Sequence, residues 1–183
     1  IAAKSGANAI KFQTFNSNKL SSKDAKKAEY QKQNLNSNND SQLEMLKKLE
    51  LSYDDFRIIF NKCKEKNIDF ISTPFDLDSV DFLDTLGVEI YKIGSGDLTN
   101  FLLLKRVAKK GKKIILSTGM SSMNEVINSV NFIKKNGCND IVVLHCVSCY
   151  PTAHKDLNLN CITTMKEKSV SYTHLRAHET PIN

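Results

Sequence analysis

The sequence predicts an α/β fold, a partial (β/α)8 TIM barrel with about five of its eight strands. Short apolar runs alternate with amphipathic stretches along the 183 residues, which is typical of a parallel sheet covered by helices. Polar side chains follow each strand at its C-terminal end, where a barrel assembles its active site from many strands. No G-x-G-x-x-G motif follows the first strand, so a doubly wound sheet with one nucleotide-binding switch point is disfavoured.

The chain begins with one strand, a long polar segment and a helix. Residues 9–13 have the apolar character of a strand. Residues 14–40 are rich in Asn, Ser and Lys, and this length is unusual for a plain loop, so we interpret them as a potential functional lid. Ser41 and Glu44 have the spacing of a capping box and predict the start of a helix.

A second helix and a second strand follow. Ser52 is the expected N-cap, with Asp55 in the first turn. Apolar residues then recur at helical spacing at Phe56, Ile59, Phe60 and Cys63. Residues 68–72 are the next strand, which ends at Thr73-Pro74.

The second half of the chain repeats a helix–strand unit three times. The predicted helices begin at Asp76, Asn100 and Ser122, and the predicted strands are 88–93, 113–116 and 141–144. A glycine follows each helix, at Gly87, Gly111 and Gly137, which suits a C-terminal cap or stop. The regular repeat supports one continuous barrel wall.

Composition and charge limit the classes of function. The longest apolar runs have about five residues, far fewer than the ~20 of a membrane helix. The net charge is +6, and the lysines lie mainly in helix-like stretches. A mild positive field suits an anionic substrate and is also compatible with nucleic acid. The odd count of five cysteines, without a visible signal peptide, indicates reduced thiols and a cytoplasmic location.

Two groups of strand-end residues point to an anionic ligand. Lys11 and Gln13 lie two residues apart on one strand, so both point inward if Phe12 packs outward. A lysine inside a barrel is costly unless it meets an anion. The turns Ser95-Gly96-Asp97 and Ser117-Thr118-Gly119 offer hydroxyls and bare N–H groups, which can bind a phosphate.

A zinc site is the rival interpretation of the last predicted strand end. The set Cys146, Cys149, His154 and Cys161 has C-x2-C-x4-H-x6-C spacing and resembles a zinc knuckle that would bind single-stranded nucleic acid. The last spacer is too long for that pattern, and Cys146 ends an apolar strand. We therefore interpret Cys146 as a small buried hydrophobe and His145 as a satisfied histidine at a strand end.

The strand-end segments together resemble the sialic acid synthase family. The matching blocks are 11–15, 28–31, 41–52, 72–76, 91–97, 116–120 and 145–151, among them Lys-Phe-Gln-Thr-Phe, Ser-Thr-Pro-Phe-Asp and Tyr-Lys-Ile-Gly-Ser-Gly-Asp. They occur in the family's order and cover about residues 1–168, so their combination is highly specific although no single block is.

The resemblance implies roles for individual residues. The residues that match positions around the phosphate of phosphoenolpyruvate are Lys11, Thr73, Ser95, Ser117 and Ser148, the last standing where several members have Asn. Lys92 matches a lysine near the carboxylate of the same substrate. Gln13, Asp97 and Tyr150 match positions around the substrates, and Asp97 and Tyr150 are the catalytic candidates. Asp97 is shorter than the more usual Glu.

For the intact enzyme, the resemblance implies an N-acetylneuraminate synthase that condenses phosphoenolpyruvate with N-acetylmannosamine. A legionaminate or pseudaminate synthase of the same family is the alternative. The resemblance also implies a divalent cation, Mn²⁺ or Mg²⁺, and a homodimer in which a small antifreeze-like domain completes the partner's site. It implies no nucleic acid and no membrane partner.

The family's pattern extends beyond this chain at both ends. Its first strand, which carries an acidic residue, would precede Ile1, and its metal-ligand block would follow Lys168. Residues 1–168 are therefore expected to be the partial barrel domain, and the fragment alone is expected to be inactive. Residues 169–183 fit no continuation of the family and look like translated adapter or misassembled sequence, so we expect them to add no barrel element.

Overall fold

The structure is a computed structural model that describes residues 1–20, 42–148 and 152–169, together with the backbone of residues 172–175. Ser41 and most of the polar segment 14–40 lie outside the described residues, as does Tyr150. Among the described residues, none of the helices combines the length and apolar character needed to cross a membrane.

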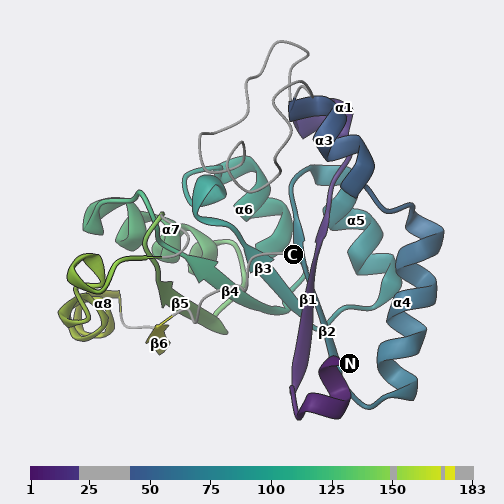
Figure 1. The fold of residues 1–183 in the computed structure, drawn as a ribbon. Coiled ribbons are helices and arrows are strands. Elements are labelled where there is room, and N and C mark those ends of the chain that lie inside the picture. The colour runs from purple at the N-terminus through teal and green to yellow at the C-terminus, as the bar shows by residue number, and fades with distance from the viewer. Residues whose placement is uncertain (21–41, 149–151, 170–171, 176–183) are drawn as a thin grey trace.

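Six parallel strands form one sheet in the order in which they occur in the chain (Figure 1). The strands are β1 (Ala9–Thr14), β2 (Asp69–Pro74), β3 (Ile90–Ile93), β4 (Lys113–Ser117), β5 (Ile141–His145) and β6 (Tyr172–Leu175). Each strand pairs with the next one along the chain, and the order never reverses. A doubly wound sheet has such a reversal. The partial (β/α)8 barrel is therefore confirmed, with all five predicted strands present.

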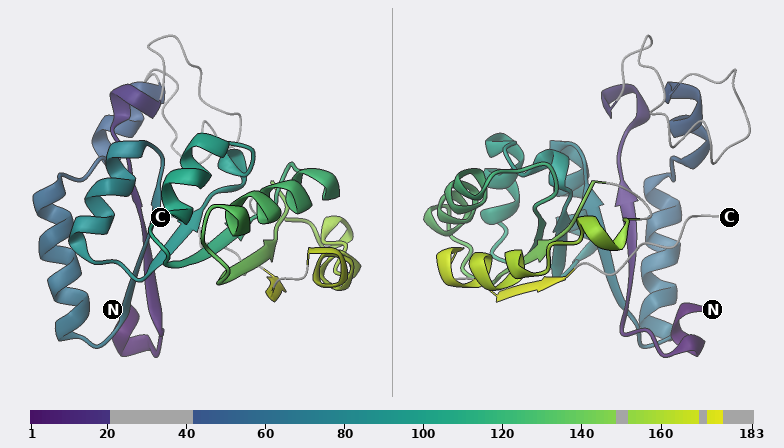
Figure 2. Two further views of the ribbon diagram at one scale, coloured as in Figure 1. Left: turned by 180° about the vertical axis from the view of Figure 1, so that it is seen from behind. Right: turned by 60° about the vertical axis from the view of Figure 1, so that its left-hand side comes forward.

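Helices follow the strands and lie along one face of the curved sheet (Figures 1 and 2). The α-helices are α1 (Ser17–Leu20), α3 (Gln42–Leu49), α4 (Tyr53–Glu65), α5 (Leu77–Leu86), α6 (Phe101–Ala108), α7 (Met123–Lys135) and α8 (Asn160–Ser169). Short 3-10 helices are η1 (Ala2–Ser5), η2 (Ser95–Asp97) and η3 (His154–Asp156). Ser52 and Asp55 form the N-terminal cap of α4 as predicted, since the Ser52 hydroxyl accepts from the Asp55 N–H and the carboxylate accepts in return.

The sixth strand corrects the prediction that residues 169–183 add no barrel element. β6 pairs with β5 in parallel, from Val142 opposite Tyr172 to His145 opposite Leu175. An open strand edge presents a row of unpaired backbone donors and acceptors, which another segment can pair with whatever its side chains are. Backbone pairing therefore brings a segment into the sheet that has no recognisable strand pattern.

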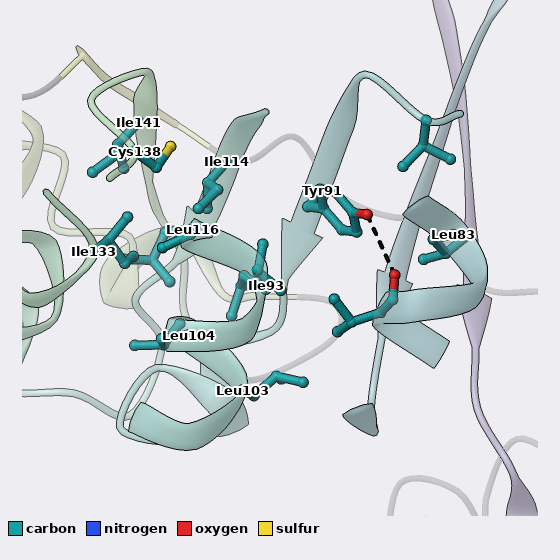
Figure 3. Close-up of a cluster of buried hydrophobic side chains, with 14 of the residues drawn as sticks. Leu83, Tyr91, Ile93, Leu103, Leu104, Ile114, Leu116, Ile133, Cys138 and Ile141 are labelled. Atoms are coloured by element: carbon teal, nitrogen blue, oxygen red, sulfur yellow. Dashed lines mark hydrogen bonds between the residues drawn. The ribbon is translucent and has the colours of Figure 1, made fainter. Parts of the chain in front are cut away.

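The hydrophobic core lies between the sheet and the helices. Figure 3 shows Ile93 of β3 near Leu104 of α6 and Leu116 of β4, whereas Tyr91 of β3 lies toward α5. All four are fully buried. Because side chains alternate across a strand, the residues between these core positions point to the opposite face of the sheet. The packing of the core thereby decides which residues of β3 and β4 can form a site.

One buried hydrogen bond fixes the loop after β3. Ser129 of α7 is fully buried, and its hydroxyl donates to the Leu98 carbonyl at 2.7 Å. Leu98 directly follows η2, the short helix that carries Ser95 and Asp97. The contact therefore attaches this strand end to the helix layer.

We expect Ser129→Ala to lower the free energy of unfolding by about 1–3 kcal/mol, because the Leu98 carbonyl would be left buried without its donor. Urea denaturation measures this change. Asn128→Ala is the matched control, since Asn128 is exposed on the same helix. Replacing Asn or Ser by Ala increases helix propensity by similar amounts. Equal stability of the two variants would contradict the structural role of the Ser129 hydroxyl.

Candidate active site at the strand ends

Lys11, Gln13 and Thr73 share the face of the sheet opposite the helices. Phe12 stacks on Phe70 in the helix-side core, with ring centroids 5.3 Å apart. Lys11 and Gln13 therefore point to the other face, as the sequence predicted. Gln13 pairs in register with Thr73, which places Thr73 on that face as well. Lys11 is half-buried, Gln13 is exposed and Thr73 is buried.

Lys92 and Ser117 form a buried pair in the middle of this face. The Lys92 ammonium donates to the Ser117 hydroxyl at 2.6 Å and to the Ile93 carbonyl at 2.7 Å. Lys92 is 5% exposed and Ser117 is fully buried. An ammonium group is stable in such a place only when its N–H groups are hydrogen-bonded or meet an anion. The pair holds a positive charge beside a hydroxyl, a combination suited to an anionic ligand.

Ser95 and Cys146 flank Gly119 at the neighbouring strand ends. A Cβ atom added to Gly119 would lie 3.3 Å from the Ser95 hydroxyl oxygen and 3.3 Å from the Cys146 sulfur. Glycine is therefore the residue that lets the ends of β3, β4 and β5 approach this closely. Sequence reasoning missed this role for Gly119, although a glycine behind two hydroxyl residues at a strand end was a usable signal.

The backbone donors of the β4 turn correct one expectation. The glycine-containing sequence predicts bare N–H groups there for a phosphate. The Thr118 N–H instead donates to the Leu144 carbonyl at 3.2 Å, and the Gly119 N–H donates to the Cys146 sulfur at 3.0 Å. The ends of β4 and β5 lie side by side because the two strands pair in parallel. Acceptors at the end of β5 and directly after it therefore already bind these two N–H groups. At this turn the Ser117 hydroxyl, rather than these two backbone amides, remains as a candidate ligand group.

Asp97 lies in η2, directly after β3, and its pKa is shifted. Burial raises the pKa of the Asp97 carboxyl, and a hydrogen bond from the Asn100 amide at 3.0 Å opposes this effect in part. The side chain is half-buried. A carboxyl that keeps its proton to higher pH can act as a general acid more readily than an exposed aspartate.

The remaining candidates differ in their positions. Ser148 is exposed just beyond β5, and Tyr150 lies outside the described residues. The structure thus joins Lys92 with Ser117 by a hydrogen bond and gathers Ser95 and Cys146 around Gly119. It places Lys11, Gln13 and Thr73 on the same face, without joining them to that cluster by a described contact.

The described residues do not fit a metal centre. No group of three or more His, Cys, Asp or Glu side chains within the described ranges could hold an ion. Of the knuckle residues, Cys146 accepts from Gly119, His154 is exposed and Cys161 packs against the core, while Cys149 lies outside those ranges. Cys146 is also half-buried rather than the buried hydrophobe we expected. His145 is buried, and its Nε2 is 2.6 Å from the Leu157 carbonyl, as expected of a satisfied histidine.

The fold and the strand-end side chains define a (β/α)8-barrel protein with a polar site at the C-terminal ends of its strands. The NeuB family model matches residues 1–182, and the chain belongs to the NeuB family. This membership agrees with the resemblance found in the strand-end segments.

Three known proteins illustrate the relationship. The chain is 45% identical over 169 residues to the N,N'-diacetyllegionaminic acid synthase of Campylobacter jejuni, covering 91% of this chain and 50% of that protein. It is 40% identical over 120 residues to the N-acetylneuraminate-9-phosphate synthase of Drosophila melanogaster, covering 66% and 32%. The crystal structure of N-acetylneuraminic acid synthetase from Leptospira borgpetersenii in complex with citrate superposes with a TM-score of 0.81 at 34% identity, covering 97% and 57%. The chain spans about half the length of the curated relatives it matches.

We expect Asp97→Asn to raise the melting temperature at about pH 7. Because burial raises the pKa of the Asp97 carboxyl in the folded state, the native state binds this proton more tightly than the unfolded state does. The charged carboxylate is therefore a stability cost that appears as pH rises through the folded pKa and is absent below the unfolded pKa. The gain on substitution should vanish at about pH 3, as thermal melts across this range would measure.

Asp55→Asn is the control of opposite sign. Hydrogen bonds from Ser52 lower the pKa of Asp55, so its charge stabilises the fold above the unfolded pKa, and this contribution is lost as pH falls through the folded pKa. We expect this variant to melt at a lower temperature at about pH 7. A stabilising effect of Asp97→Asn that is the same at every pH would contradict the burial argument.

Proposed function

We propose that the full-length protein is a phosphoenolpyruvate-dependent synthase of a nine-carbon sialic acid. The observation that carries this proposal is the buried hydrogen bond from Lys92 to Ser117 on the inner rim of a NeuB-family barrel. In the proposed reaction, C3 of phosphoenolpyruvate attacks the aldehyde carbon of an open-chain N-acetylated sugar. Water then adds at C2, and phosphate leaves by cleavage of the C–O bond.

The chain's own residues supply charge and hydrogen bonds to this reaction. Lys92 and Lys11 provide positive charge on the face where the anionic substrate would lie, and Ser117 and Ser95 provide hydroxyl donors beside it. Such preorganised groups stabilise the negative charge that develops as phosphate leaves. Thr73 and Ser148 are the further phosphate-binding candidates.

Acid–base chemistry is assigned to the rim residues nearest the sugar. The raised pKa of Asp97 suits a group that gives a proton to the sugar oxygen as the new carbon–carbon bond forms. Gln13 is the proposed sugar contact on β1, and Tyr150 is the second catalytic candidate. A Mn²⁺ or Mg²⁺ ion is a proposal for the full-length protein, since the described residues contain no group of three or more potential ligands. The homodimer and the cytoplasmic location are likewise proposals.

Two sugars are candidates for the acceptor. N-acetylmannosamine, which would give N-acetylneuraminate, is favoured by the sequence blocks and by the fold similarity to the Leptospira synthetase. A 2,4-diacetamido sugar, which would give a legionaminate-type product, is favoured by the higher identity to the Campylobacter synthase over 91% of this chain. A second N,N'-diacetyllegionaminic acid synthase, from Legionella pneumophila, is 42% identical over 171 residues, and on these two similarities we favour the 2,4-diacetamido sugar.

A paired assay tests both the reaction class and the sugar. The full-length protein is incubated with phosphoenolpyruvate and either sugar, and phosphate release and the nine-carbon product are measured. We expect sugar-dependent release with both and a higher kcat/KM for the 2,4-diacetamido sugar. A preference for N-acetylmannosamine would reverse the sugar assignment, and the absence of release with either would contradict the reaction class.

In the full-length protein, Lys11→Ala should raise the KM for phosphoenolpyruvate far more than the KM for the sugar. Loss of a charge-assisted hydrogen bond costs about 1.5–3 kcal/mol, which corresponds to roughly 10- to 150-fold. Steady-state kinetics with each substrate varied in turn measures both values. Lys105→Ala, an exposed lysine on the outer helix α6, is the control and should change neither. Unchanged phosphoenolpyruvate kinetics in Lys11→Ala would remove Lys11 from the site.

A further inference from the structure

The turn that ends β4 is held by a cysteine of the next strand. The Gly119 N–H donates to the Cys146 sulfur at 3.0 Å, one residue beyond the end of β5. Sulfur is a weak acceptor, so this contact stabilises the turn less by its strength than by giving the Gly119 N–H a partner. Among the residues that the structure describes, no other acceptor for this N–H is found.

Cys146 also limits the space around Gly119. The position of a Gly119 Cβ would be 3.3 Å from the sulfur and 3.4 Å from the Cys146 carbonyl oxygen, and 3.3 Å from the Ser95 hydroxyl on the other side. The glycine therefore sits between the ends of β3 and β5 without free room. A change in the size of the residue 146 side chain would allow Gly119, and with it Ser95, to shift.

The last residue of β4, directly before this turn, carries the hydroxyl that contacts Lys92. Ser117 is two residues before Gly119, and between them Thr118 is tied to β5 because both its N–H and its hydroxyl donate to the Leu144 carbonyl, at 3.2 and 3.0 Å. The turn thus has two attachments to β5, one at Leu144 and one at Cys146. These two contacts add to the pairing of Ser117 with Leu144 and to its hydrogen bond from Lys92, and they hold the turn that directly follows Ser117.

We propose that Cys146 is a positioning residue for the anion site, which fixes Gly119 so that Ser95 and Ser117 stay in place for the phosphate of the substrate. This inference rests on the proposed function. It assigns Cys146 no contact with the substrate: the thiol acts through the Gly119 N–H and through the packing of Gly119 against Ser95. The role of Cys146 depends on its accepting the hydrogen bond from the Gly119 N–H and not on the reactivity of its thiol.

The test uses Cys146→Ala and Cys146→Ser in the full-length protein. The alanine removes the acceptor and the bulk, so we expect the KM for phosphoenolpyruvate to rise roughly 2- to 12-fold, as for the loss of a neutral hydrogen bond, with kcat and the sugar KM changed less than about twofold. The serine keeps an acceptor for the Gly119 N–H and should restore the KM to near the wild-type value. Cys161→Ala is the control, because Cys161 is also half-buried but packs against the core from α8.

Hydrogen exchange supplies a readout that does not depend on activity. In Cys146→Ala, peptides that span Thr118 to Ser121 should exchange faster, whereas Cys146→Ser and Cys161→Ala should leave them unchanged. Unaltered exchange in Cys146→Ala would overturn the inference, and so would faster exchange with an unchanged phosphoenolpyruvate KM. A wild-type protein that consumes no phosphoenolpyruvate would instead overturn the proposed function, and an active wild type with an unaffected alanine variant would overturn only the positioning role.

Discussion

The burial of the Lys92 ammonium is the constraint on which the site depends. Lys92 lies in β3 between Tyr91 and Ile93, whose side chains are fully buried against the helices. The alternation of the strand forces its own side chain to the opposite face, where it is 5% exposed and bonded to Ser117. A slip of one residue in β3 would place the charge among Leu104 and its neighbours in the core, at a cost far above that of any single contact. The register of β3 and β4 is thereby fixed.

The strand order explains why the polar residues gather at one rim. In a parallel sheet without reversal, all strands end on the same side, so the turns after β3, β4 and β5 lie next to one another. Ser95 and Cys146 directly follow β3 and β5, Ser117 is the last residue of β4, and the small size of Gly119 lets the strand ends approach one another. One face of the sheet packs in the hydrophobic core that Figure 3 shows, and the polar side chains of the candidate site lie on the other face.

The fold could be predicted from the succession of strands and helices along the chain, and the facing of Lys11 from side-chain alternation within one strand. The hydrogen bond between Gly119 and Cys146 could not be predicted, since the two residues are 27 positions apart and meet only through the β4–β5 pairing. The same pairing uses the Thr118 N–H that seemed free in the sequence. β6 was missed because an open edge accepts backbone partners without a side-chain pattern.

β3 and the short helix after it carry two ionisable side chains of opposite charge, Lys92 and Asp97, which are buried to different extents. Lys92 is buried and hydrogen-bonded, whereas Asp97 is half-buried and its pKa is raised by that burial. Neither arrangement stabilises the fold by itself, since transferring a charge out of water is unfavourable. The surrounding elements offset the cost, with Leu98 fully buried and its carbonyl bonded to Ser129 directly behind Asp97. Buried charged groups supported by a firm apolar layer are typical of functional sites.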